Sequence, residues 1–140
     1  MNMVRRHPPV RQSEPRVEIR RVYDHDAHAA AHRVLVDRLW PRGVAKAEAP
    51  IDEWDKAVAP STELRRWYGH DPARFVEFAR RYRGELRQEP AREALDRLRA
   101  MALRQPVALV TATRDVEHSG AAVLSAVLTR AKPRRRTAAS

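Results

Sequence analysis

The chain has 140 residues, of which 43% are hydrophobic and 33% are charged, a composition typical of one soluble globular domain. It contains no cysteine, which excludes disulfide bonds, thiolate catalysis and cysteine-ligated zinc. No apolar run approaches the roughly 20 residues that span a membrane, and no signal peptide is visible. We therefore expect a cytoplasmic protein without a membrane partner.

The net charge of +10 is concentrated at the two ends of the chain. Residues 1–16 carry a net charge of +3 and residues 130–140 carry +5, whereas residues 17–129 carry only +2. Such basic tails could bind the phosphates of nucleic acid, or they could be solvated extensions. We predict a single domain over 17–130 between disordered basic tails at 1–16 and 131–140.

Three apolar runs predict the strands of one sheet. Residues 17–23 alternate imperfectly, and residues 34–40 begin apolar on both faces. Residues 107–112 are apolar or β-favouring throughout, which is typical of a buried strand. Because helical patterns separate these runs, we predict an α/β fold: a small three-layer sandwich with a mostly parallel sheet flanked by helices.

Helical signals fall on five segments. In chain order they are 51–58, 60–67, the segment from Asp71 to Pro90, the segment between Pro90 and Pro106, and 116–130. The third has the clearest start, because Asp71 can cap the first free amides and Pro72 suits the first helical position. Its apolar stripe follows helical spacing and consists of Phe75, Phe78, Tyr82 and Leu86.

The leading candidate for a functional site lies where the strand predicted over 34–40 ends. Arg38 and Arg42 bracket Trp40 there. Arginine presents a planar fork of donors that suits carboxylate or phosphate, and binding sites of α/β folds concentrate at strand ends. These residues therefore predict a preformed anion-binding corner, with Trp40 as its apolar wall.

A second polar group follows the strand predicted over 107–112. Arg114, Asp115 and His118 lie between this strand and the last predicted helix, whose first amides could attract an anion. If the two strands are parallel neighbours, both polar groups share one crevice. In this hypothesis Arg114 joins in substrate binding, His118 is the acid/base group, and Asp115 orients the imidazole.

Structural roles for the same residues stay open. Arg38 could form a salt bridge with Asp115, Trp40 could belong to the core, and Asp115 could cap the last helix. His70 and Asp71 could complete the substrate site if their turn folds over it. Alternatively, Asp71 only caps its helix and His70 is a turn residue.

The polar segment between the first two predicted strands contains four candidate metal ligands, His25, Asp26, His28 and His32. His28 and His32 stand four residues apart and would share one face of a helix. The segment is alanine-rich and shows no residues that would orient the ligands, as real metal sites require. We therefore expect neither a metal nor a cofactor.

Four separated stretches of the sequence resemble one known family. They are 33–43 (RVLVDRLWPRG), 59–65 (APSTELR), 70–72 (HDP) and 114–118 (RDVEH). In this order, over residues 17–130, they are similar to the domain-of-unknown-function 488 family, also called YeaO-like. The resemblance implies a compact α/β fold and singles out these positions, and it implies no particular reaction.

The patterns together predict a protein that binds a small phosphate- or carboxylate-bearing molecule, as an enzyme or as a ligand sensor. Two other roles remain open. One is binding of nucleic acid through the basic tails, and the other is a structural or partner-binding domain whose oligomeric state the sequence leaves open.

Overall fold

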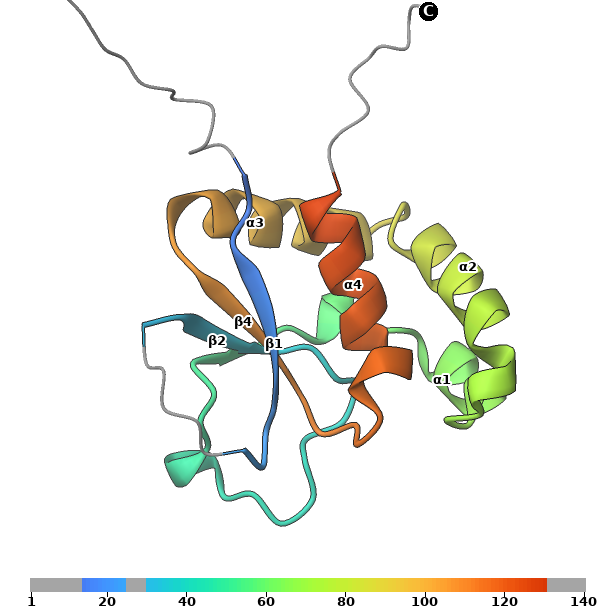
Figure 1. The fold of residues 1–140 in the computed structure, drawn as a ribbon, viewed down its shortest axis with the longest axis horizontal. Coiled ribbons are helices and arrows are strands. Elements are labelled where there is room, and N and C mark those ends of the chain that lie inside the picture. The colour runs from blue at the N-terminus through green and yellow to red at the C-terminus, as the bar shows by residue number, and fades with distance from the viewer. Residues whose placement is uncertain (1–13, 25–29, 131–140) are drawn as a thin grey trace, which may run out of the picture.

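A four-stranded parallel sheet organises the chain (Figure 1). The computed structural model describes residues 14–24 and 30–130. The strands are β1 (Val17–Arg21), β2 (His32–Leu35), β3 (Glu53–Trp54) and β4 (Val107–Thr111). Their order is β1-β4-β2-β3, and all three neighbouring pairs are parallel. The α/β sandwich with a parallel sheet is therefore confirmed, and β4 occupies a central position, as its apolar sequence predicts.

Four α-helices are described, and short 3₁₀ turns precede or connect several of them. The helices are α1 (Thr62–Tyr68), α2 (Phe75–Glu85), α3 (Ala91–Arg104) and α4 (Gly120–Thr129). None of these described helices is long and apolar enough to cross a membrane. In Figure 1, α4 lies over β1 and β4, and α1 and α2 form the part of the helical layer farthest from β2.

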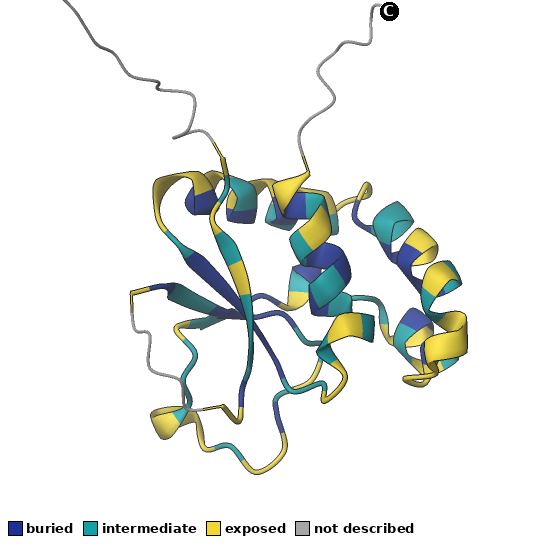
Figure 2. Cartoon of the chain, in the orientation of Figure 1, coloured by how far each residue is buried: buried dark blue, intermediate teal, exposed yellow. Residues whose placement is uncertain are grey.

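Alternating side chains divide the sheet into two faces. The larger core lies under the helices and includes Val34, Val107 and Leu109, all fully buried. The opposite face carries a smaller cluster around Leu35 and Val110. This cluster is covered by side chains from β3 and the loop after β2, namely Trp40, Ile51 and Trp54. Because both of its faces are covered, β4 is dark blue along its length in Figure 2.

The segment 51–58 does not form the predicted helix. Glu53 and Trp54 instead pair in parallel with β2, and only Lys56–Val58 makes a single 3₁₀ turn. The indole of Trp54 packs edge-on against Trp40, with 5.4 Å between ring centroids. Sheet pairing and burial of this indole therefore outweigh the local helical signal.

Two strands end earlier than the sequence predicts. β2 ends at Leu35, five residues before the predicted end, although the Val36 amide still donates to the Val110 carbonyl at 3.0 Å. β1 likewise ends at Arg21.

Of the tails predicted at 1–16 and 131–140, residues 1–13 and 131–140 lie outside the described residues. Within the described part, the Arg16 amide donates to the Ala102 carbonyl at 3.0 Å and the Arg16 carbonyl accepts from the Val107 amide at 2.9 Å.

Tyr82 ties α2 to the segment that leads into α1. Its side chain is 1% exposed, and its hydroxyl donates a hydrogen bond to the Val58 carbonyl. Burial raises the pKa of this phenol, so the hydroxyl stays protonated as a donor.

We expect Tyr82→Phe to lower the free energy of unfolding by about 1 kcal/mol in urea titrations, because the Val58 carbonyl loses its donor.

Tyr23→Phe provides the matched control for this substitution. Tyr23 is 43% exposed, and its hydroxyl donates to the Arg42 carbonyl at 3.1 Å. Because water can replace an exposed donor, we expect this variant to change stability by less than about 0.5 kcal/mol. Equal losses in both variants would show that burial does not set the strength of the Tyr82 hydrogen bond.

Candidate functional site

The side chain of Asp37 joins the carboxyl ends of the two central strands. Asp37 lies just beyond β2, and its carboxylate accepts hydrogen bonds from the Thr111 hydroxyl at 2.7 Å and the Ala112 amide at 2.8 Å. The Trp54 indole donates to the Asp37 carbonyl at 2.8 Å, which also fixes the backbone. Burial raises the pKa of the Asp37 carboxyl, against the opposing effects of its two hydrogen bonds and of the nearby His70.

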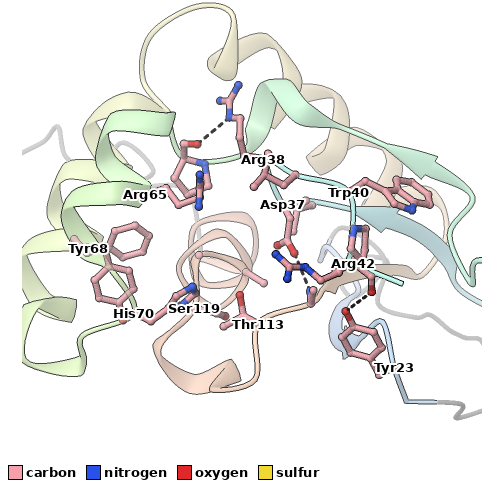
Figure 3. A pocket seen from close by; sticks show the side chains of 18 residues that line it. Tyr23, Asp37, Arg38, Trp40, Arg42, Arg65, Tyr68, His70, Thr113 and Ser119 are labelled. Atoms are coloured by element: carbon pink, nitrogen blue, oxygen red, sulfur yellow. Dashed lines mark hydrogen bonds between the residues drawn. The ribbon is translucent and has the colours of Figure 1, made fainter. Parts of the chain in front are cut away.

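A cavity of about 390 Å³ opens at this edge of the sheet (Figure 3). Its walls come from the loop after β2, from α1 and its following turn, and from the segment that joins β4 to α4. Figure 3 shows Asp37 between Arg65 and His70 on one side and Arg42 and Trp40 on the other. The cavity therefore lies where the sequence predicts a crevice, at the carboxyl ends of β2 and β4.

The first residues of α4 form one wall of this cavity. Ser119 caps the helix, because its hydroxyl oxygen accepts from the Ala122 amide at 3.1 Å and its hydroxyl donates to the Val116 carbonyl at 2.6 Å. Gly120 and Ala121 line the cavity, and their amides have no acceptor within the part of the chain that the structure describes. These two amides give the wall a partial positive charge.

A glycine at position 120 allows α4 to approach this closely. A Cβ atom on Gly120 would lie 3.2 Å from a ring carbon of Pro60, which is tighter than ordinary van der Waals contact.

The predicted start of the last helix near residue 116 is wrong by about one turn, because α4 begins at Gly120. Val116–His118 forms a separate 3₁₀ turn, and the capping residue is Ser119, not Asp115.

The three arginines of the cavity differ in what they bind. Arg38 donates from Nε to the Pro60 carbonyl at 3.1 Å and from Nη2 to the Ala59 carbonyl at 3.3 Å. By contrast, the Arg65 and Arg42 side chains have no hydrogen-bond or ion-pair partner among the described residues, and the Nε atom of Arg65 is buried. Arg38 therefore holds the chain in place, whereas Arg65 and Arg42 have donors to offer.

Four of the predicted site residues line the cavity, namely Arg38, Trp40, Arg42 and His70. The Trp40 indole is itself fixed, since its N–H donates to the Val44 carbonyl at 2.6 Å. His70 has a left-handed backbone with φ 58° in the turn after α1. Its neighbour Asp71 accepts from the Ala73 amide at 3.0 Å, so it caps the next turn, as the structural alternative predicts.

The other three predicted residues, Arg114, Asp115 and His118, are not among the cavity-lining residues. His118 Nδ1 lies 2.8 Å from an Asp115 carboxylate oxygen, so the expected pair is present on the surface. The imidazole packs edge-on against Phe75, with 5.2 Å between ring centroids, and the Tyr68 hydroxyl donates to the His118 carbonyl. The alternative salt bridge between Arg38 and Asp115 does not form.

Of the four candidate metal ligands before β2, the structure describes only His32. His32 is at the amino end of β2, where its ring nitrogens lie 3.5 Å from a Glu53 oxygen and 3.9 Å from an Asp52 oxygen. The remaining candidate ligands, His25, Asp26 and His28, fall outside the described residues.

Sequence reasoning missed Asp37 and Arg65. Asp37 stands inside the strand that the pattern extends to Trp40, so no separate role for it is apparent there. Arg65 belongs to the 59–65 stretch that carries the family resemblance. That stretch was the one signal that could have identified it.

Substitution of the two loop arginines separates their roles. We expect Arg38→Ala to lower the free energy of unfolding by about 1–3 kcal/mol, because the carbonyls of Ala59 and Pro60 lose charged donors. Arg42→Ala should stay within about 0.5 kcal/mol of the parent, because its side chain has no partner among the described residues. Urea unfolding monitored by tryptophan fluorescence measures both. A larger loss for Arg42→Ala would reverse the assignment.

Comparison with known proteins places this architecture in a family. A family model described as the inactive DUF488-N3 subclade matches residues 16–140. The chain belongs to the DUF488 family. Among the relatives of this DUF488 protein, an uncharacterized protein of Mycobacterium tuberculosis is 49% identical over 115 residues, which is 82% of this chain and 95% of the relative.

A more distant relative of this DUF488 chain is the uncharacterized protein YeaO of Escherichia coli, which is 37% identical over 109 residues. The match covers 78% of this chain and 93% of YeaO. No solved structure matches the chain significantly. The resemblance inferred from the four motif stretches is therefore confirmed at the level of the family.

Proposed function

We propose that this DUF488 protein binds a small molecule through its phosphate or carboxylate group, in the cavity at the carboxyl ends of β2 and β4. The observation that carries the proposal is the position of Arg65. Its guanidinium lines the cavity and has no hydrogen-bond or ion-pair partner among the described residues. A hydrogen bond from such a charged donor to a phosphate or carboxylate is worth about 1.5–3 kcal/mol, so an anionic ligand would gain from meeting it.

Other donors support binding of an anion there. The amides of Gly120 and Ala121 lack acceptors within the described part of the chain, and the start of α4 attracts negative charge. Arg42 adds a second guanidinium that has no partner in the described part of the chain, on the side of the cavity opposite Arg65 (Figure 3). The anionic group of the ligand would therefore meet charged and neutral donors from α1, from the loop after β2 and from α4.

The proposal is binding without turnover, as in a ligand sensor. The matched subclade is described as inactive. The Ser119 hydroxyl is occupied by its capping contacts, and the pair formed by His118 and Asp115 does not line the cavity. The residues expected to act as acid and base therefore have no direct access to a ligand held by Arg65.

A pair of adjacent arginines provides the test. Arg65 faces the cavity, whereas Arg66 is exposed on the same helix and does not line it. In calorimetric or thermal-shift titrations with a panel of phosphorylated and carboxylated metabolites, we expect Arg65→Ala to weaken binding roughly 10- to 100-fold, because a charged donor is lost. Arg66→Ala, which removes the same charge from the surface, should weaken it less than threefold.

Equal losses in the two variants would show that only the overall charge attracts the ligand, and full affinity in Arg65→Ala would place the site elsewhere.

Nucleic-acid binding through the basic tails stays a prediction of the sequence. It would be indicated by an affinity that is unaffected by Arg65→Ala and falls steeply with salt concentration.

A further inference from the structure

We propose that the ligand carries a hydroxyl group beside its anionic group, and that Asp37 selects for it by accepting a hydrogen bond. This inference rests on the proposed function, because it concerns the same cavity. It assigns the ligand to the class of hydroxyl-bearing organic anions, such as sugar or polyol phosphates, and it makes Asp37 a specificity-determining residue.

Asp37 is a rigid acceptor with unused capacity. The Thr111 hydroxyl binds one carboxylate oxygen and the Ala112 amide binds the other. The Thr111 hydroxyl oxygen in turn accepts from the Thr113 amide at 3.1 Å, which fixes its position. An ionised carboxylate offers about four acceptor sites, so two remain open. Asp37 lines the cavity, and Figure 3 shows its carboxylate directed into it.

The charge of Asp37 works against a bare anion. Among the described residues no basic side chain forms an ion pair with Asp37, and the nearby His70 acts on its charge only without direct contact. An inorganic phosphate held by Arg65 would face this carboxylate within the same cavity. A hydroxyl on the ligand removes the conflict, because it donates to Asp37 and separates the two negative groups.

The sign of the remaining charges favours a neutral donor over an ammonium group. Arg38, Arg42 and Arg65 all line the cavity, whereas Asp37 is the one carboxylate among the lining residues. A cationic amine would meet repulsion from these guanidiniums, but a hydroxyl would not. A hydroxyl is therefore the donor that satisfies Asp37 at the lowest electrostatic cost.

The size of the cavity also fits an organic ligand. Its volume of about 390 Å³ falls within the range of roughly 300–1,000 Å³ found for small-molecule sites. An anionic group bound by Arg65 would leave space for a carbon skeleton. Val36, Trp40 and Phe78 supply apolar lining for that skeleton.

Two phosphates of similar size test the inference in the full chain. Glycerol 3-phosphate carries two hydroxyls that propyl phosphate lacks, and both present the same phosphate group. In isothermal titrations, we expect the parent protein to bind glycerol 3-phosphate about 10-fold more tightly, since a hydrogen bond to a charged acceptor is worth about 1.5 kcal/mol or more. Equal affinities in the parent protein would overturn the inference without any variant.

Substitution of Asp37 then locates the effect. We expect Asp37→Asn to reduce the preference to less than threefold, with propyl phosphate binding more tightly than before because the repulsion is gone. Asp115→Asn, which removes a carboxylate outside the cavity, should keep the preference. A preference that persists in Asp37→Asn, in protein shown by circular dichroism to be folded, would also overturn the assignment.

Failure of this inference is distinguishable from failure of the proposed function. If inorganic phosphate and propyl phosphate bind as tightly as glycerol 3-phosphate, and Arg65→Ala weakens all three, the cavity binds anions but does not select a hydroxyl. If none of the three binds the parent protein, both proposals fall.

Discussion

The hydrogen bonds of the Asp37 carboxylate to Thr111 and Ala112 are the interaction on which the site depends. They join the end of β2 to the end of β4, where the chain leaves the sheet in two directions. The segment after β2 forms the loop that carries Arg38 to Arg42, and the segment after β4 leads to the capped start of α4. A carboxylate so deeply placed is costly to keep ionised, and its raised pKa reflects that cost.

The arginines of the cavity illustrate how structural and functional cations differ. The Arg38 guanidinium donates to the carbonyls of Ala59 and Pro60. These hydrogen bonds fix the segment whose Pro60 ring packs against Gly120. Arg65 has the same chemistry but meets no acceptor in the described structure. Because Arg65 also lines the cavity, its guanidinium is the one on which the proposed anion site is built. The proposed anion site therefore depends on Arg65, whereas the sequence emphasises Arg38 and Arg42.

Much of the fold follows from local patterns, whereas the site follows only in part. The buried runs around Val34 and Leu109 predict the central strands, because continuous apolar sequence is typical of parallel sheets. Trp40 and Arg42 are predictable as cavity residues because they lie at the end of the strand predicted over 34–40, on the loop that follows β2. Asp37 and Arg65 were not found, because their positions depend on where β2 ends and on how α1 packs, which are tertiary properties. The expected start of the last helix misplaced His118, since Ser119 and Gly120 set that start one turn later.

The central claim is that an anion meets Arg65 and the first amides of α4 in one cavity. The most direct measurement is a ¹⁵N-resolved NMR titration of the full chain with glycerol 3-phosphate, with the backbone amides and the arginine Nε–H groups assigned. The account predicts that the largest shifts fall on the Arg65 Nε–H and on the amides of Gly120 and Ala121, and that they saturate together. Shifts confined to exposed arginines such as Arg66, or to the terminal residues, would contradict it.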